Sequence, residues 1–320
     1  MPSSTLFAQL ETNILLASII NNATRDGNWN DVRHPDPSTV RNNIDSRLAN
    51  LKSGSDFYVA WGPAIAVGQN GYACNLTVVL KGPDDDYRVV TSGTNPDSTY
   101  DVQNEDNDVF SLQSLAQLFP CPPDVKISEG AFAGVDKIWT TGSSIDGGLA
   151  LLPAFVSSIS DSSIVQVVGH SLGGALASVL VLCLMESCPN RAYHCNTFGA
   201  PTAGNSAFAK YFYGRLGVRG IRVFNTLDTI ACGWSTDTLE SVKTIYDPLI
   251  QTPASVIQKI EGAVAQTSAL GYTQPGVSIS LPGSVDQSLI ASSTPETAFD
   301  VQADYQHNDA YIQLLSVTSD

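Results

Sequence analysis

Residues 164–174 read IVQVVGHSLGG, and this stretch decides the fold class. The apolar run at 164–168 predicts a buried strand, and residues 172–185 have the composition of a helix that follows it at once. The Gly-x-Ser-x-Gly pattern centred on Ser171 is typical of a sharp strand-to-helix turn that exposes the serine hydroxyl. The amino-terminal N–H groups of such a helix favour negative charge that forms near this hydroxyl. We therefore predict that Ser171 is a catalytic nucleophile; a glycine-rich turn with a capping serine is the alternative.

Outward from this turn, short β-rich runs alternate with helical stretches. Strands are predicted at 75–80 and 88–91 before the turn, and at 193–198 and 221–225 after it. Apolar strands that alternate with helices indicate a mostly parallel central sheet with helices on both faces, so the predicted fold class is α/β. Catalytic side chains in such folds lie in the loops at the carboxyl ends of the strands.

The chain shows no repeat and no low-complexity linker that would mark a domain boundary. We therefore predict a single domain over residues 1–320. Residues 233–274 interrupt the alternation, because most of this segment looks helical, with apolar positions at helical spacing, and it has no evident strand partner. This segment is predicted to form a helical excursion or cap.

Composition and charge exclude several kinds of partner. The 320 residues include 31 acidic and 16 basic side chains, which give a formal net charge of −15. A polyanion is not attracted to nucleic acid or to an anionic membrane surface, so neither is expected as a partner. No apolar run approaches the roughly 20 residues of a transmembrane helix. A native Met1 would favour a cytoplasmic location, whereas a mature chain with an added methionine would favour an extracellular one.

A serine nucleophile needs a base, and the sequence contains four histidines. His34 lies in a proline-rich segment, His170 is adjacent to the nucleophile and directed away from it, and His194 enters a predicted strand before any plausible acid. In folds with this turn, the partners follow along the chain in the order Ser, Asp, His. His307 is therefore the predicted base; a surface histidine in a polar segment is the alternative.

The acid that orients the base lies between Ser171 and His307. Asp228 follows the predicted strand at 221–225, at the end of the sheet from which a carboxylate can reach the imidazole. We predict Asp228 as the acid, with a turn or helix-capping aspartate as the alternative reading. The other candidates are Asp237, Asp247, Asp286, Asp300 and Asp304.

These segments resemble the class 3 lipase family, which comprises the fungal-type triacylglycerol lipases and feruloyl esterases of α/β-hydrolase fold. The resemblance spans residues 58–311. It is strong at 168–177 and at 197–205, and moderate at 127–132. It implies an α/β-hydrolase fold and a serine carboxylic-ester hydrolase that acts on acylglycerol lipids through an acyl-enzyme, without cofactor or metal.

The resemblance also implies an oxyanion hole. The family's oxyanion loop is matched by Thr91-Ser-Gly-Thr94, so the amide and hydroxyl of Thr94 and the amide of Leu172 are expected to face the oxyanion. The loop lacks the aromatic residue and the arginine that the family carries there. The family's acid motif is matched by Asp228-Thr-Ile-Ala231, in which alanine replaces the expected proline.

The sequence allows more than one substrate class and more than one lid segment. The expected substrate is a neutral ester or lipid, including one at an oil–water interface, while a feruloyl or short-chain ester is an alternative. From another functional class, a catalytically silent lipid-binding or signalling module would have the same fold. A lid is expected either at residues 95–119, where 109–119 place apolar side chains on one helical face, or at 233–274. An ordinary packed helix is the alternative at 109–119.

An acidic run accompanies the predicted oxyanion loop. Eight of the 31 carboxylates lie between residues 84 and 108. We hypothesise that they form a negative rim that favours neutral esters over anionic lipids; a solvated loop is the alternative. The eight are Asp84, Asp85, Asp86, Asp97, Asp101, Glu105, Asp106 and Asp108.

Overall fold

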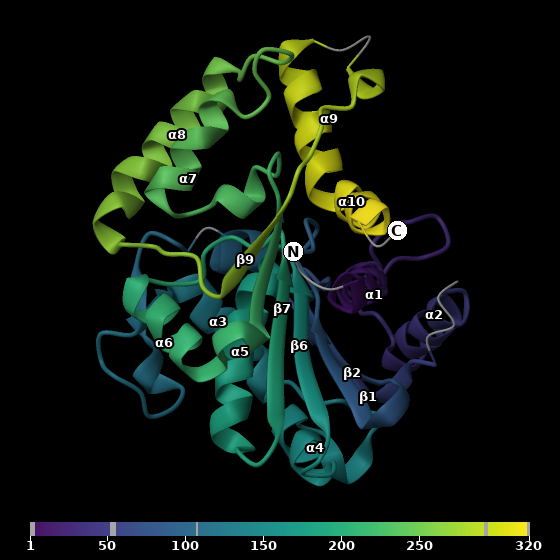
Figure 1. The fold of residues 1–320 in the computed structure, drawn as a ribbon. Helices are drawn as coiled ribbons and strands as arrows, with labels where there is room; N and C mark the ends of the chain where they lie inside the picture. Colours follow the sequence, from purple (N-terminus) through teal and green to yellow (C-terminus); the bar gives the residue numbers. More distant parts are fainter. Residues whose placement is uncertain (1–3, 52–55, 107, 291–293, 319–320) are drawn as a thin grey trace.

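A seven-stranded sheet forms the centre of the molecule (Figure 1). The structure is a computed structural model that describes residues 4–51, 56–106, 108–290 and 294–318. In spatial order the strands are β1 (Tyr58–Val67), β2 (Ala73–Lys81), β3 (Asp86–Thr91), β6 (Ile164–His170), β7 (Ala192–Phe198), β8 (Gly220–Asn225) and β9 (Val277–Leu281). The first three pair antiparallel, and every pair from β3 to β9 is parallel. The predicted α/β class is confirmed.

Helices cover both faces of this sheet, which explains the continuous apolar strands. One face packs against α3 (Glu129–Thr140), α4 (Leu152–Ser158), α5 (Leu172–Ser187) and α6 (Ser206–Leu216). The other face packs against α1 (Ser4–Asn21), α2 (Pro37–Ala49) and α10 (Ala310–Thr318). Within β6, Val165 and Val167 belong to the first core and Val168 to the second. No helix among the described residues combines the length and the apolar character that a membrane span requires.

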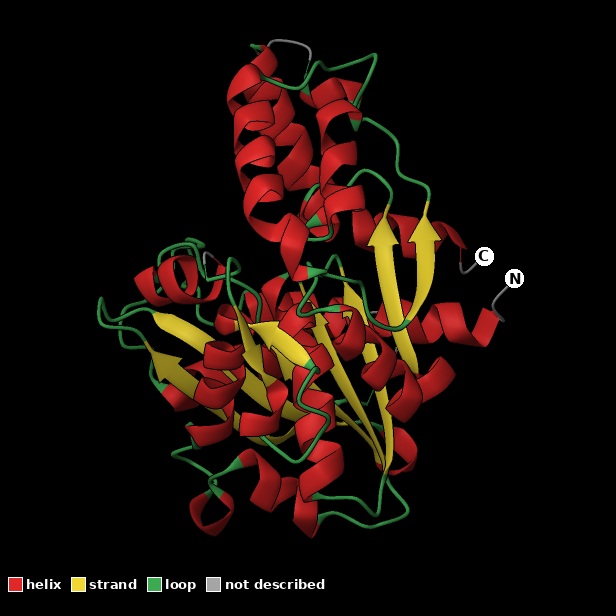
Figure 2. Cartoon of the chain, turned by 90° about the vertical axis from the view of Figure 1, so that its left-hand side faces the viewer, coloured by secondary structure: helices red, strands yellow, loops and turns green. Residues whose placement is uncertain are grey.

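A separate group of helices stands above the carboxyl ends of the strands (Figures 1 and 2). It consists of α7 (Thr236–Ser241), α8 (Ala254–Thr267) and α9 (Pro295–Asn308), and we call it the helical cover. Its buried side chains form their own small cluster, which includes Leu239 of α7, Ile260 of α8 and Phe299 of α9. Strand β9 lies between α8 and α9 in the chain and joins the sheet beside β8.

The prediction of a helix at residues 109–119 is wrong. The chain forms β4 (Leu112–Ser114) and a short 3₁₀ turn at Leu115–Gln117 instead. Strand β4 pairs antiparallel with β5 (Lys126–Ser128), and Leu115 is fully buried beneath this pair whereas Phe110 is 42% exposed. A helical face cannot be separated from a short strand by apolar spacing alone, because the pairing partner is more than ten residues away.

The acidic run does not form one continuous rim. In the parallel pairing of β3 with β6, Asp86 lies opposite Ile164 and Thr91 lies opposite Gly169, so Asp84–Asp86 sit at the end of the sheet away from Ser171. Glu105 is buried, and its side chain accepts a hydrogen bond from the Asn75 amide at 3.2 Å. The side chain of Asp101 lies outside the described residues. Of the run, Asp106 lines both of the cavities described below, and Glu105 lines the apolar one.

Candidate active site

Ser171 occupies a strained turn between β6 and α5. Its φ and ψ are 59° and −134°, a backbone conformation that a non-glycine residue rarely adopts. A Cβ on Gly169 would lie 2.1 Å from the carbonyl oxygen of Gly173, and a Cβ on Gly173 would lie 2.5 Å from the carbonyl oxygen of Ser92. The two glycines of the pattern are therefore required by backbone packing, and the turn they permit exposes the Ser171 hydroxyl.

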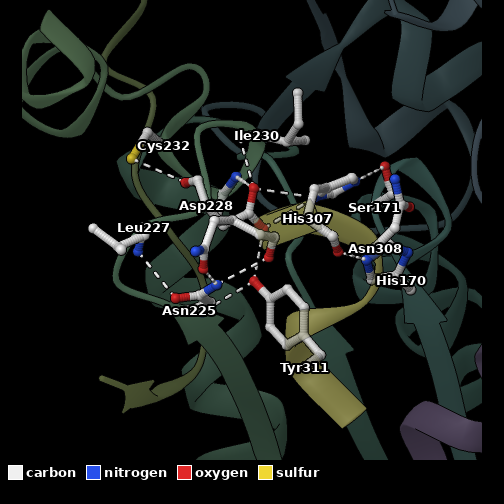
Figure 3. Close-up of polar contacts among 12 residues, drawn as sticks. His170, Ser171, Asn225, Leu227, Asp228, Ile230, Cys232, His307, Asn308 and Tyr311 are labelled. Atoms are coloured by element: carbon white, nitrogen blue, oxygen red, sulfur yellow. Dashed lines mark hydrogen bonds and ion pairs between the residues drawn. The ribbon is translucent and has the colours of Figure 1, made fainter. Parts of the chain in front are cut away.

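The three predicted triad residues lie together (Figure 3). The Oγ atom of Ser171 is 2.8 Å from Nε2 of His307. Nδ1 of His307 is 3.0 Å from each carboxylate oxygen of Asp228. Ser171 is held by the β6–α5 turn, Asp228 by the loop after β8, and His307 by the last turn of α9. The imidazole thus lies between the hydroxyl and the carboxylate, within hydrogen-bond distance of both.

Asp228 is fully buried and surrounded by donors. The amides of Ile230 and Ala231 donate to Oδ1 at 2.9 and 3.3 Å, and the Tyr311 hydroxyl donates to Oδ2 at 2.7 Å. Ala231 stands where the family has proline, and its N–H makes a bond that proline cannot make. Burial acts to raise the pKa of Asp228, but His307 and the hydrogen bonds from His307 and Tyr311 together hold that pKa below its ordinary value.

His170 supports the base instead of acting as one. Its Nε2 lies 2.8 Å from the backbone oxygen of His307, and the two imidazole rings are 4.5 Å apart between centroids. Burial, together with the nearby His307, lowers the pKa of His170 to about 3, so its ring is neutral at ordinary pH. The neutral ring donates from Nε2 to the His307 carbonyl and accepts at Nδ1 from Asn21, whose Nδ2 is 3.3 Å away.

Asn21 connects this pair to the predicted oxyanion loop. It is the last residue of α1, and its Oδ1 accepts the Gly93 amide at 2.8 Å. The interactions therefore run from Gly93 through Asn21 and His170 to the backbone of His307. The supporting roles of Asn21, His170 and Tyr311 were missed by sequence reasoning, because their contacts join segments that are more than 70 residues apart and have no spacing signal.

The predicted oxyanion residues lie beside the nucleophile. A Cβ on Gly93 would lie 3.3 Å from Cβ of Ser171, so the loop that carries Thr94 passes directly against the turn. Leu172 is the first residue of α5, and its N–H therefore has no acceptor within the helix. The Thr94 hydroxyl donates to Oδ1 of Asp106 at 3.1 Å, so this hydroxyl is engaged by a carboxylate in the structure.

Asp106 has a perturbed carboxyl group. Burial raises the pKa of Asp106 to about 6, although the hydrogen bond from Thr94 acts to lower it. Its side chain lines both of the cavities that meet at Ser171. Perturbed carboxyls of this kind are concentrated at functional sites.

Two cavities of different character meet at Ser171. The apolar cavity, of about 390 Å³, lies beneath the helical cover and is lined by Leu172 and Ala175 of α5 and by Leu239, Val242, Ile260 and Phe299. The polar cavity, of about 710 Å³, lies between α1 and the end of α9. Ser171, Thr94, Asp106 and Ile230 line both cavities. A molecule that crosses the nucleophile would therefore place one part in each.

A metal centre is not evident in the part of the chain that the structure describes. No three His, Cys, Asp or Glu side chains there are grouped so that they could hold an ion. All six cysteines are free, and Cys183 packs in the core behind Ser171.

Fold and site together define a class. A mostly parallel sheet that carries Ser, Asp and His at the carboxyl ends of its strands, in this chain order, is the arrangement of serine hydrolases of α/β-hydrolase fold. Comparison with known proteins shows which family part of the chain resembles. The class 3 lipase family profile matches residues 154–232. Phospholipase A1 EG1, chloroplastic/mitochondrial, of Oryza sativa subsp. indica is 33% identical over 135 residues, which are 38% of this chain and 31% of the rice protein.

Solved structures agree with this result. M37 lipase has a TM-score of 0.81 and 25% identity, over 98% of this chain and 93% of its own. A mutant form of MDLA from Penicillium cyclopium has a TM-score of 0.53 and 16% identity, over 90% and 83% of the two chains, and supports the fold alone. The matched stretch spans less than a third of the rice protein's length. The α/β-hydrolase fold and the resemblance to the class 3 lipase family are confirmed.

Proposed function

We propose that the protein is a serine carboxylic-ester hydrolase that cleaves acylglycerol lipids through an acyl-enzyme. The observation that carries the proposal is the continuous line of hydrogen bonds from Ser171 through His307 to Asp228, with distances of 2.8 and 3.0 Å. The similarity to class 3 lipases and to a phospholipase A1 supports a lipid ester as the substrate.

The proposed reaction begins when Oγ of Ser171 attacks the ester carbonyl carbon and transfers its proton to Nε2 of His307. Asp228 stabilises the imidazolium that forms, and the amides of Thr94 and Leu172 donate to the oxyanion. The tetrahedral intermediate expels the alcohol, which takes the proton from His307. Water, deprotonated by His307, then attacks the acyl-enzyme and releases the carboxylic acid together with free Ser171.

The apolar cavity is the proposed acyl site. It opens at Ser171, and its walls come from α5 and the helical cover, so an acyl chain there replaces water with apolar contacts. We also propose that residues 233–274 act as the cap of a single domain, because α7 and α8 supply the cavity side chains Leu239 and Ile260.

The direct test is the hydrolysis of p-nitrophenyl esters from acetate to palmitate by the wild-type chain and by Ser171→Ala. Wild type should cleave the series, with the highest kcat/KM at medium or long chains. Ser171→Ala should retain the circular dichroism spectrum and lose activity by about 10⁴-fold or more. Activity of the variant within tenfold of wild type would exclude Ser171 as the nucleophile.

Two alternatives are separated by the same series. A short-chain esterase would show its highest kcat/KM for the acetate ester, and a feruloyl esterase would hydrolyse methyl ferulate, measured beside the series, faster than any member of it. A silent lipid-binding module would hydrolyse none of the esters while still binding fatty acid.

A further inference from the structure

The polar cavity is built differently from a site for a second acyl chain. Its wall on the α1 side carries Ser18, Asn21 and Asn22, and its wall on the α9 side carries Asn308. These side chains supply hydroxyl and amide groups that both donate and accept hydrogen bonds. An acyl chain placed against them would displace water without replacing its hydrogen bonds, which opposes binding.

The charges of the polar cavity disfavour an anionic group. Of the described residues that line it, Arg25 is the one lysine or arginine, whereas Asp106, Asp304 and Asp309 are carboxylates. The Arg25 guanidinium is already engaged, because Nε lies 3.5 Å from Oδ2 of Asp31 and NH1 donates to Oδ1 of Asn22 at 2.9 Å. A phosphate would therefore meet three carboxylates and one cation that is paired elsewhere.

An aromatic surface lies at the same cavity. Trp29 lines it and is 63% exposed, and the Arg47 guanidinium holds the indole ring from 5.1 Å above its centroid. An exposed indole beside amide and carboxylate groups matches a ligand that has apolar C–H faces and hydroxyl edges. Sugars and glycerol have this combination.

We propose that the polar cavity receives the alcohol half of the ester and selects a neutral, hydroxyl-rich headgroup over a phosphate-bearing one. This inference rests on the proposed function, because it places the scissile ester at Ser171 with its acyl half in the apolar cavity. Hydroxyl groups of the headgroup bond to the hydrogen-bonding positions that Asn22 and Asn308 keep beside their bonds to Ser18, Arg25 and Asp304. The carboxylates that line the cavity repel phosphate. The headgroup is that of a monoacylglycerol or of a glycosyl monoacylglycerol.

The experiment measures kcat/KM of the full chain on oleoyl substrates in mixed micelles of one neutral detergent. The substrates are 1-monooleoylglycerol, monooleoyl galactosylglycerol, triolein and the monooleoyl forms of phosphatidylcholine and phosphatidylglycerol, with p-nitrophenyl butyrate as the substrate without a headgroup. Either 1-monooleoylglycerol or the galactosyl substrate should exceed both phospholipids at least tenfold, and whichever is higher identifies the source of the headgroup.

Variants test the two walls separately. Asp304→Asn combined with Asp309→Asn should raise phosphatidylglycerol hydrolysis relative to the neutral lipid by about tenfold, because like-charge repulsion is removed. Asp300→Asn is the matched control, since Asp300 is exposed on the same helix α9 and does not line the cavity.

Asn22→Leu should reduce the preference for the hydroxyl-rich headgroup over triolein about tenfold. Asn28→Leu, at an exposed position outside the cavity, should leave this preference unchanged.

The substrate series separates failure of the headgroup proposal from failure of the proposed function. Phospholipid hydrolysis equal to or faster than that of the neutral lipids, or ratios that the double variant leaves unchanged, would overturn the headgroup proposal while p-nitrophenyl butyrate hydrolysis keeps the proposed function intact. Loss of hydrolysis for every substrate, including p-nitrophenyl butyrate, would overturn both.

Discussion

The sheet and the helical cover hold the candidate triad in different ways. Ser171 and Asp228 follow strands β6 and β8, whose side chains pack in the two large cores on either side of the sheet. His307 ends α9, and α9 packs through Phe299 into the small cluster of the helical cover. The Tyr246 hydroxyl links that cover to the acid loop by donating to the Leu227 carbonyl at 3.0 Å.

This difference implies different sensitivities. The nucleophile and the acid share the stability of the sheet, whereas the base depends on a smaller cluster that buries fewer side chains. Alignment of His307 is therefore the part of the site that is lost first when the fold is weakened. Substitutions in the sheet and in the helical cover should therefore affect activity and stability differently.

The link between the acid and the base should carry the largest effect. Asp228→Asn removes the charge that stabilises the His307 imidazolium and should lower kcat for p-nitrophenyl esters by about 10⁴-fold with KM nearly unchanged. Asp237→Asn, at an exposed aspartate of α7, should have little effect. Full activity of Asp228→Asn would place the acid elsewhere.

The two packing regions should respond differently to the loss of a buried phenylalanine. Phe299→Ala in the cover and Phe208→Ala in the sheet core should each destabilise their surroundings by about 3–5 kcal/mol. Urea titrations followed by esterase activity and by far-UV circular dichroism compare the two. For Phe299→Ala, activity should be lost at a lower urea concentration than the dichroism signal, whereas for Phe208→Ala the two midpoints should coincide. Coincident midpoints in both variants would mean that cover and sheet unfold as one unit.

Asp106 should make the stability of the oxyanion region depend on pH. Because burial raises the pKa of Asp106 from 3.8 to about 6, the folded chain keeps a proton that the unfolded chain releases near pH 4. The bound proton of Asp106 therefore adds to the free energy of unfolding. This contribution is complete below pH 4 and is lost as pH rises through 6, a change of at most about 3 kcal/mol. Asp106→Asn should therefore increase the free energy of unfolding above pH 7 relative to wild type, with the difference vanishing below pH 4. A difference that is constant between pH 4 and 8 would contradict this assignment.

The connection from Gly93 to His307 should have the smallest effect. Asn21→Leu removes both hydrogen bonds of this side chain and should lower kcat for p-nitrophenyl butyrate about tenfold. Ser18→Ala, one turn earlier on α1 and also at the polar cavity, is the control. Equal kinetics of the two variants would show that Asn21 does not position the loop or the base.

The sequence was informative where local rules apply. The apolar strand, the two glycines and the helix around Ser171 form one continuous pattern, and the chain order Ser, Asp, His allowed Asp228 and His307 to be chosen. The structure brings these three side chains together. Their catalytic roles stay predictions until they are measured.

Contacts between distant segments could not be read in the same way. Residues 109–119 have apolar spacing that fits a helix, but pairing with β5 makes part of this segment a strand. Strand β9 was not predicted, since it lies between two helices of the helical cover, α8 and α9, far along the chain from its partner β8. The acidic run was contiguous in sequence, yet β3 carries its first part to the far end of the sheet. Chain proximity alone does not give spatial proximity across a sheet.

We propose that Ser171, activated by His307, is the nucleophile that forms the acyl-enzyme. The most direct measurement is mass spectrometry of the intact chain and its peptides after reaction with a serine-directed alkyl phosphonate. We predict one covalent adduct, located on Ser171, which forms together with the loss of esterase activity and is abolished in Ser171→Ala and strongly slowed in His307→Ala. Absence of an adduct on the wild-type chain, or an equal adduct on Ser171→Ala, would contradict the claim.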